Sequence, residues 1–360
     1  MLAVDQRAVE PPDNSQWQGV LDLAASELLL PALWRAAEDR QWFTRLPDDA
    51  LVAVEARLHR GTTSPTLLLQ RAYDDNAVRT RELLVEGDAI ARALAEAGIT
   101  YVPLKGWHTI LDGWWNDPAT RVLRDLDVLV PEADAPRALD VLTQAGFAPI
   151  DEPLDDYADH QLPAIASPRH PLSVEIHTAL AVSRWREVLP AADVLAAARG
   201  GRMSTTHAVI HSIVHAELHD EAHLLRHLPL RALHELAVVA QSAAASAIDW
   251  DEVRSRFGRA GRRASAALDA HLGSARSLFG AQVPARSAPS SSARVRAHLA
   301  LCQLELVSPR AARAYRATVF VPRAWGEARL HRLYGDGNVW RLRARHVRRR
   351  LRFGRPAGGS

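Results

Sequence analysis

Two aspartates, Asp125 and Asp127, stand two residues apart in the segment RDLDVLV. In an extended strand this spacing sends both side chains to the same face of a sheet, while the residue between them points to the other face. Neighbouring carboxylates repel each other, so the pair costs stability unless water screens it or a cation lies between the two groups. Mg²⁺ prefers oxygen ligands of this kind. The pattern therefore indicates a magnesium site, and the alternative is an edge strand whose acidic side chains face solvent.

A third carboxylate and an imidazole lie in a second strand-like segment, SVEIHTAL. Strand alternation puts Glu175 and His177 on one face of this segment and the apolar residues beside them on the other. If the two segments pair as neighbours, Glu175 joins Asp125 and Asp127. Three carboxylates on two adjacent strands can hold two metal ions, one that activates an attacking oxygen and one that stabilises the leaving group in a displacement at phosphorus.

The chain has 44 lysine and arginine residues, and Lys105 is its only lysine. It stands between the apolar run YVPL and Gly106, where a strand is expected to turn into a helix. Free backbone N–H groups at the start of a helix attract phosphate, and an ammonium group is a compact point charge where a planar guanidinium needs more room. The sequence therefore predicts a phosphate site at Lys105 and Gly106. The alternative is the chance placement of one lysine in an exposed turn.

Hydrophobic periodicity predicts the elements that position these residues. From about residue 17 to Gly98, apolar residues recur at intervals of three and four, which predicts helices that end at that glycine. Between residues 99 and 180 the expected order is strand, helix, strand, helix, strand, strand. We expect the strands at 99–105, 124–130, 147–150 and 171–180, and the second helix at 131–146. Beyond residue 184 the pattern is helical again.

Together these residues resemble a known family. The order of the motifs is a Leu-Lys-Gly turn, arginines just before an Asp-hydrophobic-Asp strand, a Leu-Val pair, and a Glu two residues before a His. The matching residues are Leu104, Lys105, Gly106, Arg121, Arg124, Asp125, Asp127, Leu129, Val130, Glu175 and His177. Residues 97 to 180 of the chain are thereby similar to the bacterial uncharacterised nucleotidyltransferase family, a branch of the DNA polymerase beta nucleotidyltransferase superfamily.

The resemblance implies an enzyme that transfers a nucleoside monophosphate from a nucleoside triphosphate to an acceptor hydroxyl. It implies Mg²⁺ as the cofactor, with Mn²⁺ as an alternative, and an acceptor that is a small molecule, a peptide or a protein. The residues expected at the site are Asp125, Asp127 and Glu175 as catalytic metal ligands, Lys105, Gly106, Arg121 and Arg124 as phosphate ligands, and His177 in the acceptor pocket.

A second function class stays open beside this one. Lys105 and Gly106 stand where the superfamily usually has two glycines or Gly-Ser, so the way in which the triphosphate is held differs. The alternative is a catalytically inactive module of the same fold that binds a nucleotide or a partner and regulates a neighbouring protein.

The expected fold class is α+β, in which a small mixed β-sheet is flanked by helical regions on both sides of the sequence. The expected divisions are a helical region at 1–96, the nucleotidyltransferase core at 97–182, a helical region at 183–283, a linker at 284–293, and helices with an arginine-rich tail at 294–360. The linker is expected in the segment PARSAPSSSA because its composition is of low complexity.

Composition excludes several classes of protein. One cysteine, Cys302, excludes a disulfide framework, and the sequence shows neither a secretory signal pattern nor an apolar run of about 20 residues. We therefore expect a cytoplasmic protein with no membrane span. Arginines crowd the end of the chain after Asp336, where no acidic residue follows. Nucleic-acid binding through Arg341–Arg355 is one use of this tail, but a solvated helix that packs by its apolar side is favoured.

Six histidines recur every four residues: His207, His211, His215, His219, His223 and His227. On one α-helix a four-residue step advances about 40° beyond a full turn, so the six positions wind across about 200° of surface and do not form one row. A neighbouring pair could bind zinc, but no third ligand is apparent in the sequence. Packed, capping or solvated histidines are therefore the favoured interpretation.

Overall fold

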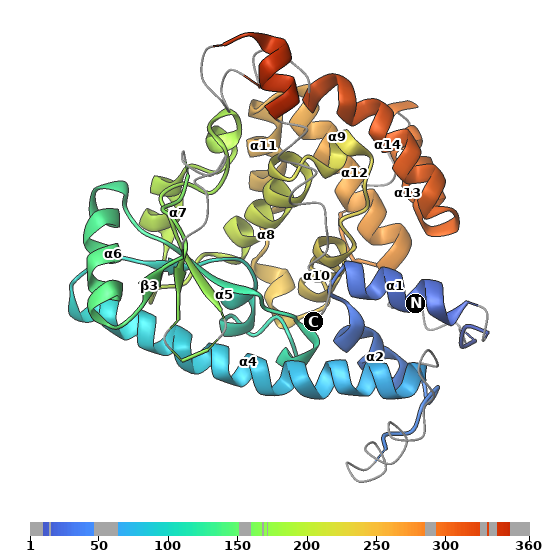
Figure 1. Ribbon diagram of the computed structural model, residues 1–360, viewed down its shortest axis with the longest axis horizontal. Helices are drawn as coiled ribbons and strands as arrows, with labels where there is room; N and C mark the ends of the chain where they lie inside the picture. Colours follow the sequence, from blue (N-terminus) through green and yellow to red (C-terminus); the bar gives the residue numbers. More distant parts are fainter. Residues whose placement is uncertain are drawn as a thin grey trace.

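A computed structural model describes residues 10–13, 16–46, 64–150, 160–167, 169–170, 172–284, 293–324, 330 and 337–345. The fold is α+β, as predicted, with a five-stranded sheet between helices from both sides of the sequence (Figure 1). The predicted linker lies outside the described residues apart from its two ends, and so does the arginine-rich tail beyond Arg345.

The sheet has the strand order β1-β2-β5-β4-β3 and is mixed. Its strands are β1 (Val102–Pro103), β2 (Asp125–Leu129), β3 (Ala148–Pro149), β4 (Ile165–Ala166) and β5 (Ser173–His177). The two longest strands, β2 and β5, are parallel neighbours, and every other pair is antiparallel. The chain crosses from β2 to the far side of the sheet through α6 (Ala135–Gln144), so the two central strands can point the same way.

All four predicted strands are shorter in the structure than expected, and one strand was not predicted. The segment 99–105 contributes only two residues to β1, because Pro103 has no N–H for a ladder hydrogen bond. The segment 147–150 similarly yields the exposed two-residue strand β3, which also contains a proline. The strand β4 was missed because two residues are too few for an alternating pattern to be visible.

The N-terminal region consists of α1 (Trp17–Ser26), α2 (Leu30–Asp39) and the long α4 (Pro65–Glu96), which runs along one side of the molecule (Figure 1). The helix α4 begins with the Ser64 side chain as its cap and a proline in its first turn. Gly98 follows its C-cap, Ala97, and terminates the helix. The φ of +67° at Gly98 lets the N–H of Ile99 bond back to the carbonyl of Leu94. The predicted helix end is thereby confirmed.

The second half of the chain is a stack of helices that lies beside the sheet (Figure 1). Its longer elements are α7 (Ala191–Ala197), α8 (Thr205–Ile213), α10 (Leu230–Val239), α11 (Trp250–Arg259), α12 (Arg262–Phe279), α13 (Ala293–Val307) and α14 (Pro309–Ala324). Between α8 and α10 lie a π-helical segment, η4 (Val214–His219), and the short α9 (Ala222–Leu225). Two 3-10 turns also belong to this half, η3 (Ser183–Val188) and η5 (Ala243–Ala247).

The region around the sheet contains the seven-residue helix α5 (Lys105–Leu111) and the 3-10 turns η1 (Pro118–Thr120) and η2 (Glu132–Asp134).

One continuous hydrophobic cluster joins these parts. It contains side chains of α1 and α2, the central strands, α8, α10 and α12. Trp107, Trp114 and Trp115, beside the predicted phosphate turn, are all buried in it. Within the described ranges, the structure has no helix whose length and apolar character would suit a membrane crossing.

Candidate active site

The pairing of β2 with β5 brings the predicted carboxylates together. Asp127 lies opposite Glu175 and Asp125 lies opposite Ser173 in the parallel register. The residues between them, Leu126 and Val174, are fully buried on the other face. The three carboxylates therefore share one face of the sheet, as the alternation predicted.

Asp127 is the most enclosed of the three carboxylates, with 2% of its side chain exposed. Its Oδ1 accepts a hydrogen bond from Lys105 Nζ at 2.7 Å and lies 2.8 Å from His177 Nε2. Burial alone would raise the pKa of Asp127, but the ammonium group and the imidazole hold it well below its usual range. Burial would likewise lower the pKa of Lys105, but Asp127, Asp125 and Glu175 raise it. The only lysine of the chain thus stays charged among three acids.

His177 lies behind the carboxylates, with only 4% of the residue exposed. Its Nε2 is also 3.4 Å from Glu175 Oε2, so the imidazole bridges both acids. Burial disfavours its charged form, but these two contacts outweigh it and raise the pKa of His177. The structure therefore places the histidine beneath the site, as a support for Asp127 and Glu175, and its expected contact with an acceptor stays a prediction.

Lys105 reaches Asp127 from an unusual backbone conformation. Its φ is +50°, in the left-handed region, which costs a residue with a Cβ about 1–2 kcal/mol. The expected tight turn is therefore present, but it turns at Lys105, the first residue of α5, and not at the following glycine.

Gly106 is needed for close packing. A Cβ at this position would lie 2.4 Å from Leu123 Cδ2 and 3.0 Å from the guanidinium carbon of Arg121. No side chain fits there without moving its neighbours, so the glycine keeps the start of α5 close to the segment that leads into β2.

The two arginines of the predicted phosphate site have different surroundings. Arg121 is buried, and its Nε donates to Glu235 Oε2 at 2.9 Å across 114 residues of sequence. Its backbone carbonyl accepts a hydrogen bond from Asn76 of α4, which fixes the segment before β2. Arg124 is exposed at the edge of the site. The arginines are thus one structural cation and one that is open to a ligand.

A cleft of about 670 Å³ opens over the carboxylate face, and its size suits a nucleotide. One wall holds Lys105, Asp125 and Glu175, and the facing wall comes from α8, η4 and α10. The polar and charged residues that line the cleft are Glu27, Lys105, His108, Thr109, Arg121, Arg124, Asp125, Ser173, Glu175, His211, Ser212, His215, Asp220, His227, Arg231 and Glu235. Burial and the nearby Asp127 charge raise the pKa of Asp125.

Sequence reasoning missed the part of the facing wall that α10 contributes. Arg231 and Glu235 stand one helical turn apart on α10, and both line the cavity. Their spacing of four residues, with opposite charges, is a signal that they share a helix face. Nothing in the sequence, however, indicated that this face meets the carboxylates more than 50 residues earlier.

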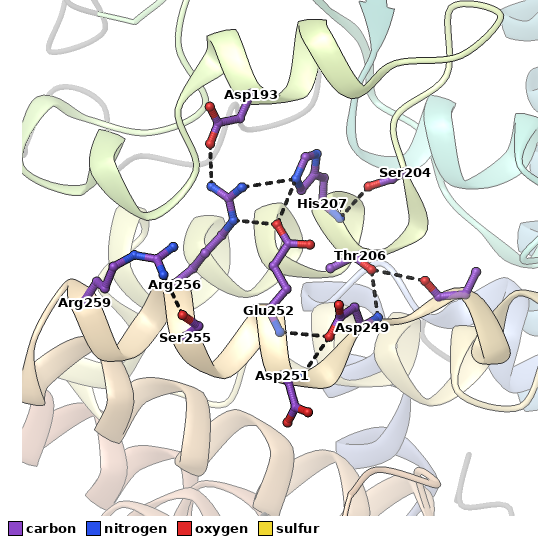
Figure 2. Close-up of polar contacts among 11 residues, drawn as sticks. Asp193, Ser204, Thr206, His207, Asp249, Asp251, Glu252, Ser255, Arg256 and Arg259 are labelled. Atoms are coloured by element: carbon purple, nitrogen blue, oxygen red, sulfur yellow. Dashed lines mark hydrogen bonds and ion pairs between the residues drawn. The ribbon is translucent and has the colours of Figure 1, made fainter.

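The six regularly spaced histidines are not on one helix, because α8, η4 and α9 divide them. His207 belongs to a polar network in which Arg256 contacts Asp193, Glu252 and the histidine itself (Figure 2). This network ties α7, α8 and α11 together. Of the remaining members, His211, His215 and His227 line the cleft, and His227 also contacts Glu27 and Glu305. The ring of His219 stacks on that of His215, and His223 is buried.

The carboxylates on the sheet fit a magnesium ion. Ligand atoms of Asp127, Glu175 and His177 all lie within 4.8 Å of one another; the two carboxylates supply oxygen, and His177 lies behind them as their contact. Asp125 and Glu175 line the cleft with carboxylate oxygens, the hard donors that Mg²⁺ or Mn²⁺ prefers. The ammonium of Lys105 balances only part of the negative charge of the three carboxylates. A divalent cation would offset the negative charge that remains.

Comparison with known proteins identifies the family of the chain. A comparison with curated proteins and one with solved structures each found no match. The family model described as "Uncharacterised nucleotidyltransferase" matches residues 13–280, which include α1, the whole sheet, the cleft and the helices through α12. On this match the chain belongs to the uncharacterised nucleotidyltransferase family.

Proposed function

We propose that this protein transfers a nucleoside monophosphate from a nucleoside triphosphate to an acceptor hydroxyl. The observation that carries the proposal is the convergence of Asp125, Asp127 and Glu175 on one face of two parallel strands, beside the single lysine. Family membership supports the general reaction, and the size of the cleft supports a nucleotide as the ligand.

The three carboxylates would hold Mg²⁺, with Mn²⁺ as a substitute. When bound, the ion would neutralise phosphate charge and polarise the bonds to the reacting phosphorus. Asp125 and Glu175 reach the cleft directly, whereas Asp127 stays behind them, oriented by Lys105 and His177. This order keeps the charge of Asp127 fixed while the two outer carboxylates meet the substrate.

The triphosphate would lie against the cations of the cleft. Lys105 is one-quarter exposed and directed at the carboxylates, so it suits a phosphate oxygen beside the ion site. Arg124 and Arg231 flank the cavity on opposite walls and offer planar guanidinium groups. Arg121 is already paired with Glu235, so it would hold the wall in place more than bind phosphate.

The acceptor hydroxyl would attack the α-phosphorus while held by the outer carboxylates. A bond forms between its oxygen and that phosphorus, the bond to the bridging oxygen breaks, and pyrophosphate leaves with the bonding electrons. The proton of the hydroxyl passes to Glu175, whose carboxylate faces the cleft. Fixed charges and correct positioning supply most of the rate in such transfers.

The acceptor would enter along the helical wall of the cleft, between α8 and α10. His211, Ser212 and Asp220 present hydrogen-bonding groups there. A small molecule, a peptide or a protein side chain with a free hydroxyl fits this chemistry.

The test is transfer of label from each of the four α-labelled ribonucleoside triphosphates, with Mg²⁺ or Mn²⁺, to pooled metabolites, peptides and proteins. We expect pyrophosphate release with one triphosphate, and a loss of at least about 100-fold in Asp125→Asn. Asp140→Asn is the matched control, because this aspartate is exposed on α6, away from the cleft. Equal transfer by wild type and Asp125→Asn would remove the carboxylates from the mechanism.

One observation favours the second candidate, a nucleotide-binding module without turnover. Oδ1 of Asp127 is already bonded by both Lys105 and His177, so this carboxylate is partly satisfied before any ion binds. Calorimetry separates the two functions. Triphosphate binding without pyrophosphate release in the presence of any acceptor pool would assign the module, and turnover would exclude it.

A further inference from the structure

A second group of metal-ligating side chains lies away from the cleft, in the packing between helices. It consists of Glu217 of η4, His223 of α9, His271 of α12, and His298 and Cys302 of α13. All five are buried, and none is more than 3% exposed. A glutamate is almost never fully buried unless it is paired, and buried charged groups are paired or coordinate a metal.

Two contacts within the group fix one side of Glu217 and one side of His298. His271 Nδ1 lies 2.8 Å from Glu217 Oε1, and Cys302 Sγ lies 3.4 Å from His298 Nε2. The rings of His223 and His298 face each other with their centroids 5.2 Å apart. The glutamate and His298 are therefore fixed in orientation from behind.

The other side of both residues has no hydrogen-bond partner in the part of the chain that the structure describes. These buried atoms are Glu217 Oε2 and His298 Nδ1. Buried polar atoms of this kind are rare in native proteins, and a bound ion or water is the usual explanation. The glutamate lies on η4 and the histidine on α13, two elements that are distant in the sequence. An ion between them would satisfy both buried atoms.

The distances fit one ion. Glu217, His223 and His298 each offer a ligand atom, and these atoms all lie within 4.8 Å of one another. In a tetrahedral zinc site with bonds of about 2.0–2.1 Å, neighbouring donors are about 3.3–3.4 Å apart, so small side-chain shifts would close the site.

We propose that Glu217, His223 and His298 bind a zinc ion in a buried structural site, separate from the carboxylates of the cleft. Two imidazoles and a carboxylate are typical zinc ligands, whereas Mg²⁺ prefers oxygen alone. A water molecule would complete the tetrahedron. His271 and Cys302 are positioning residues, because each contacts a ligand on the side that faces away from the ion.

The position of this site gives it a structural role. His298 belongs to α13, which begins after residue 280, where the family match ends. Glu217 belongs to the π-helical segment η4, whose His215 lines the cleft two residues earlier. The ion would therefore fasten α13 to the element that forms one wall of the cleft.

The test is the zinc content of the purified full-length protein, measured by elemental mass spectrometry after dialysis. We expect one zinc ion per chain in the wild type, and a loss of this zinc in Glu217→Gln and His298→Ala. His219→Ala is the matched control. With His215 and Asp220, this histidine forms a second group whose ligand atoms lie within 4.8 Å, on the cleft side of the same segment.

Retention of zinc by His298→Ala together with its loss from His219→Ala would overturn the proposal and move the ion to the cleft. A wild type that holds no zinc, and whose melting temperature responds neither to added zinc nor to a chelator, would also overturn it. Circular dichroism checks the fold of each variant.

Cys302→Ala keeps the proposal falsifiable if the ligand variants fail to fold. It removes none of the three proposed ligands but does remove the contact behind His298. We expect its zinc affinity, measured by competition with a chelating dye, to fall about 10- to 100-fold. Affinity equal to that of the wild type would contradict the assigned arrangement. These readouts do not involve nucleotidyl transfer, so the two proposals stand or fall separately.

Discussion

The Lys105–Asp127 contact makes the sharpest prediction for the stability of the protein. The substitution Lys105→Met removes the ammonium group but keeps a stem of similar length in the same left-handed backbone. Asp127, whose side chain is 2% exposed in the wild type, would then keep only His177 of the two side-chain partners described above. The change therefore isolates the charge of the lysine from its backbone conformation.

The structure sets the magnitude. Removal of one partner of a buried ion pair costs about 3–5 kcal/mol, because the other charge stays buried without compensation. Lys105 is 24% exposed, and Asp127 keeps the hydrogen bond to His177, so we expect the lower end of that range. Lys105→Met with Asp127→Asn should cost less than the sum of the single changes, because no buried charge then remains.

The assay is urea denaturation of the two single variants and the double variant, followed by circular dichroism. The pH dependence provides an internal check. The pKa of Asp127 is lowered in the fold, so its stabilisation is present above the unfolded value of about 3.9 and is lost as the pH falls. The difference between wild type and Lys105→Met should accordingly shrink in acid, where a protonated Asp127 needs no cation.

Two results would refute this reasoning. The first is a free energy of unfolding for Lys105→Met within about 0.5 kcal/mol of the wild type at neutral pH, which is the range of ordinary surface substitutions. The second is strict additivity of the two single changes. Either result would mean that the ammonium does not compensate the buried carboxylate.

Three further predictions concern the supports of the site. Gly106→Ala places a Cβ 2.4 Å from Leu123 and should lower the free energy of unfolding by about 1–3 kcal/mol in urea denaturation; an unchanged value would contradict the close packing. Glu235→Gln leaves the buried Arg121 without its ion pair and should cost about 3 kcal/mol in the same assay, whereas a neutral effect would show that the pair is dispensable. Two carboxylates overcome the effect of burial and raise the pKa of His227 to about 9. Its stabilisation is therefore full below the unfolded value of about 6.5 and should be lost up to about pH 9, a dependence that His227→Gln removes from pH-dependent melting curves.

The central strands were predictable because local pattern determines them. Asp125 and Asp127 alternate with apolar residues, and Glu175 with His177 does the same in β5, so burial of one face fixes the direction of all four side chains. Gly98 similarly predicts the end of α4, because a glycine readily adopts the positive φ that terminates a helix. These features need no knowledge of distant residues.

The remaining features depend on contacts between distant segments. The pairing of Arg121 with Glu235 spans 114 residues, and no local pattern specifies it. Strand alternation puts His177 on the same face of β5 as Glu175, which lines the cleft. Its place beneath Asp127 follows from the register of β2 and β5, which the sequence of β5 alone does not specify.

The positions of the six histidines could not be predicted from their spacing, for a related reason. The winding estimate assumed one α-helix, whereas the chain changes to a π-helix at Val214 and reverses into a left-handed residue at Glu221. The proposed zinc site contains only one of the six, His223, and its other ligands are Glu217 and His298 of α13, which the spacing of the histidines could not reveal.

The π-helical segment also has an implication for how this sequence tolerates insertions and deletions. A π turn holds one more residue than an α turn, so it behaves as a one-residue insertion that α8 absorbs without losing its direction. Deleting Ala216 would restore ordinary helical winding, and the later positions would keep nearly the same direction relative to α8, because the deletion removes the one residue that the π turn accommodates. His215 would stay over the cavity and Glu217 would stay in the helical interior. The same deletion within α8 would instead turn all later positions by about 100° and separate the cleft-facing side chains from the interior.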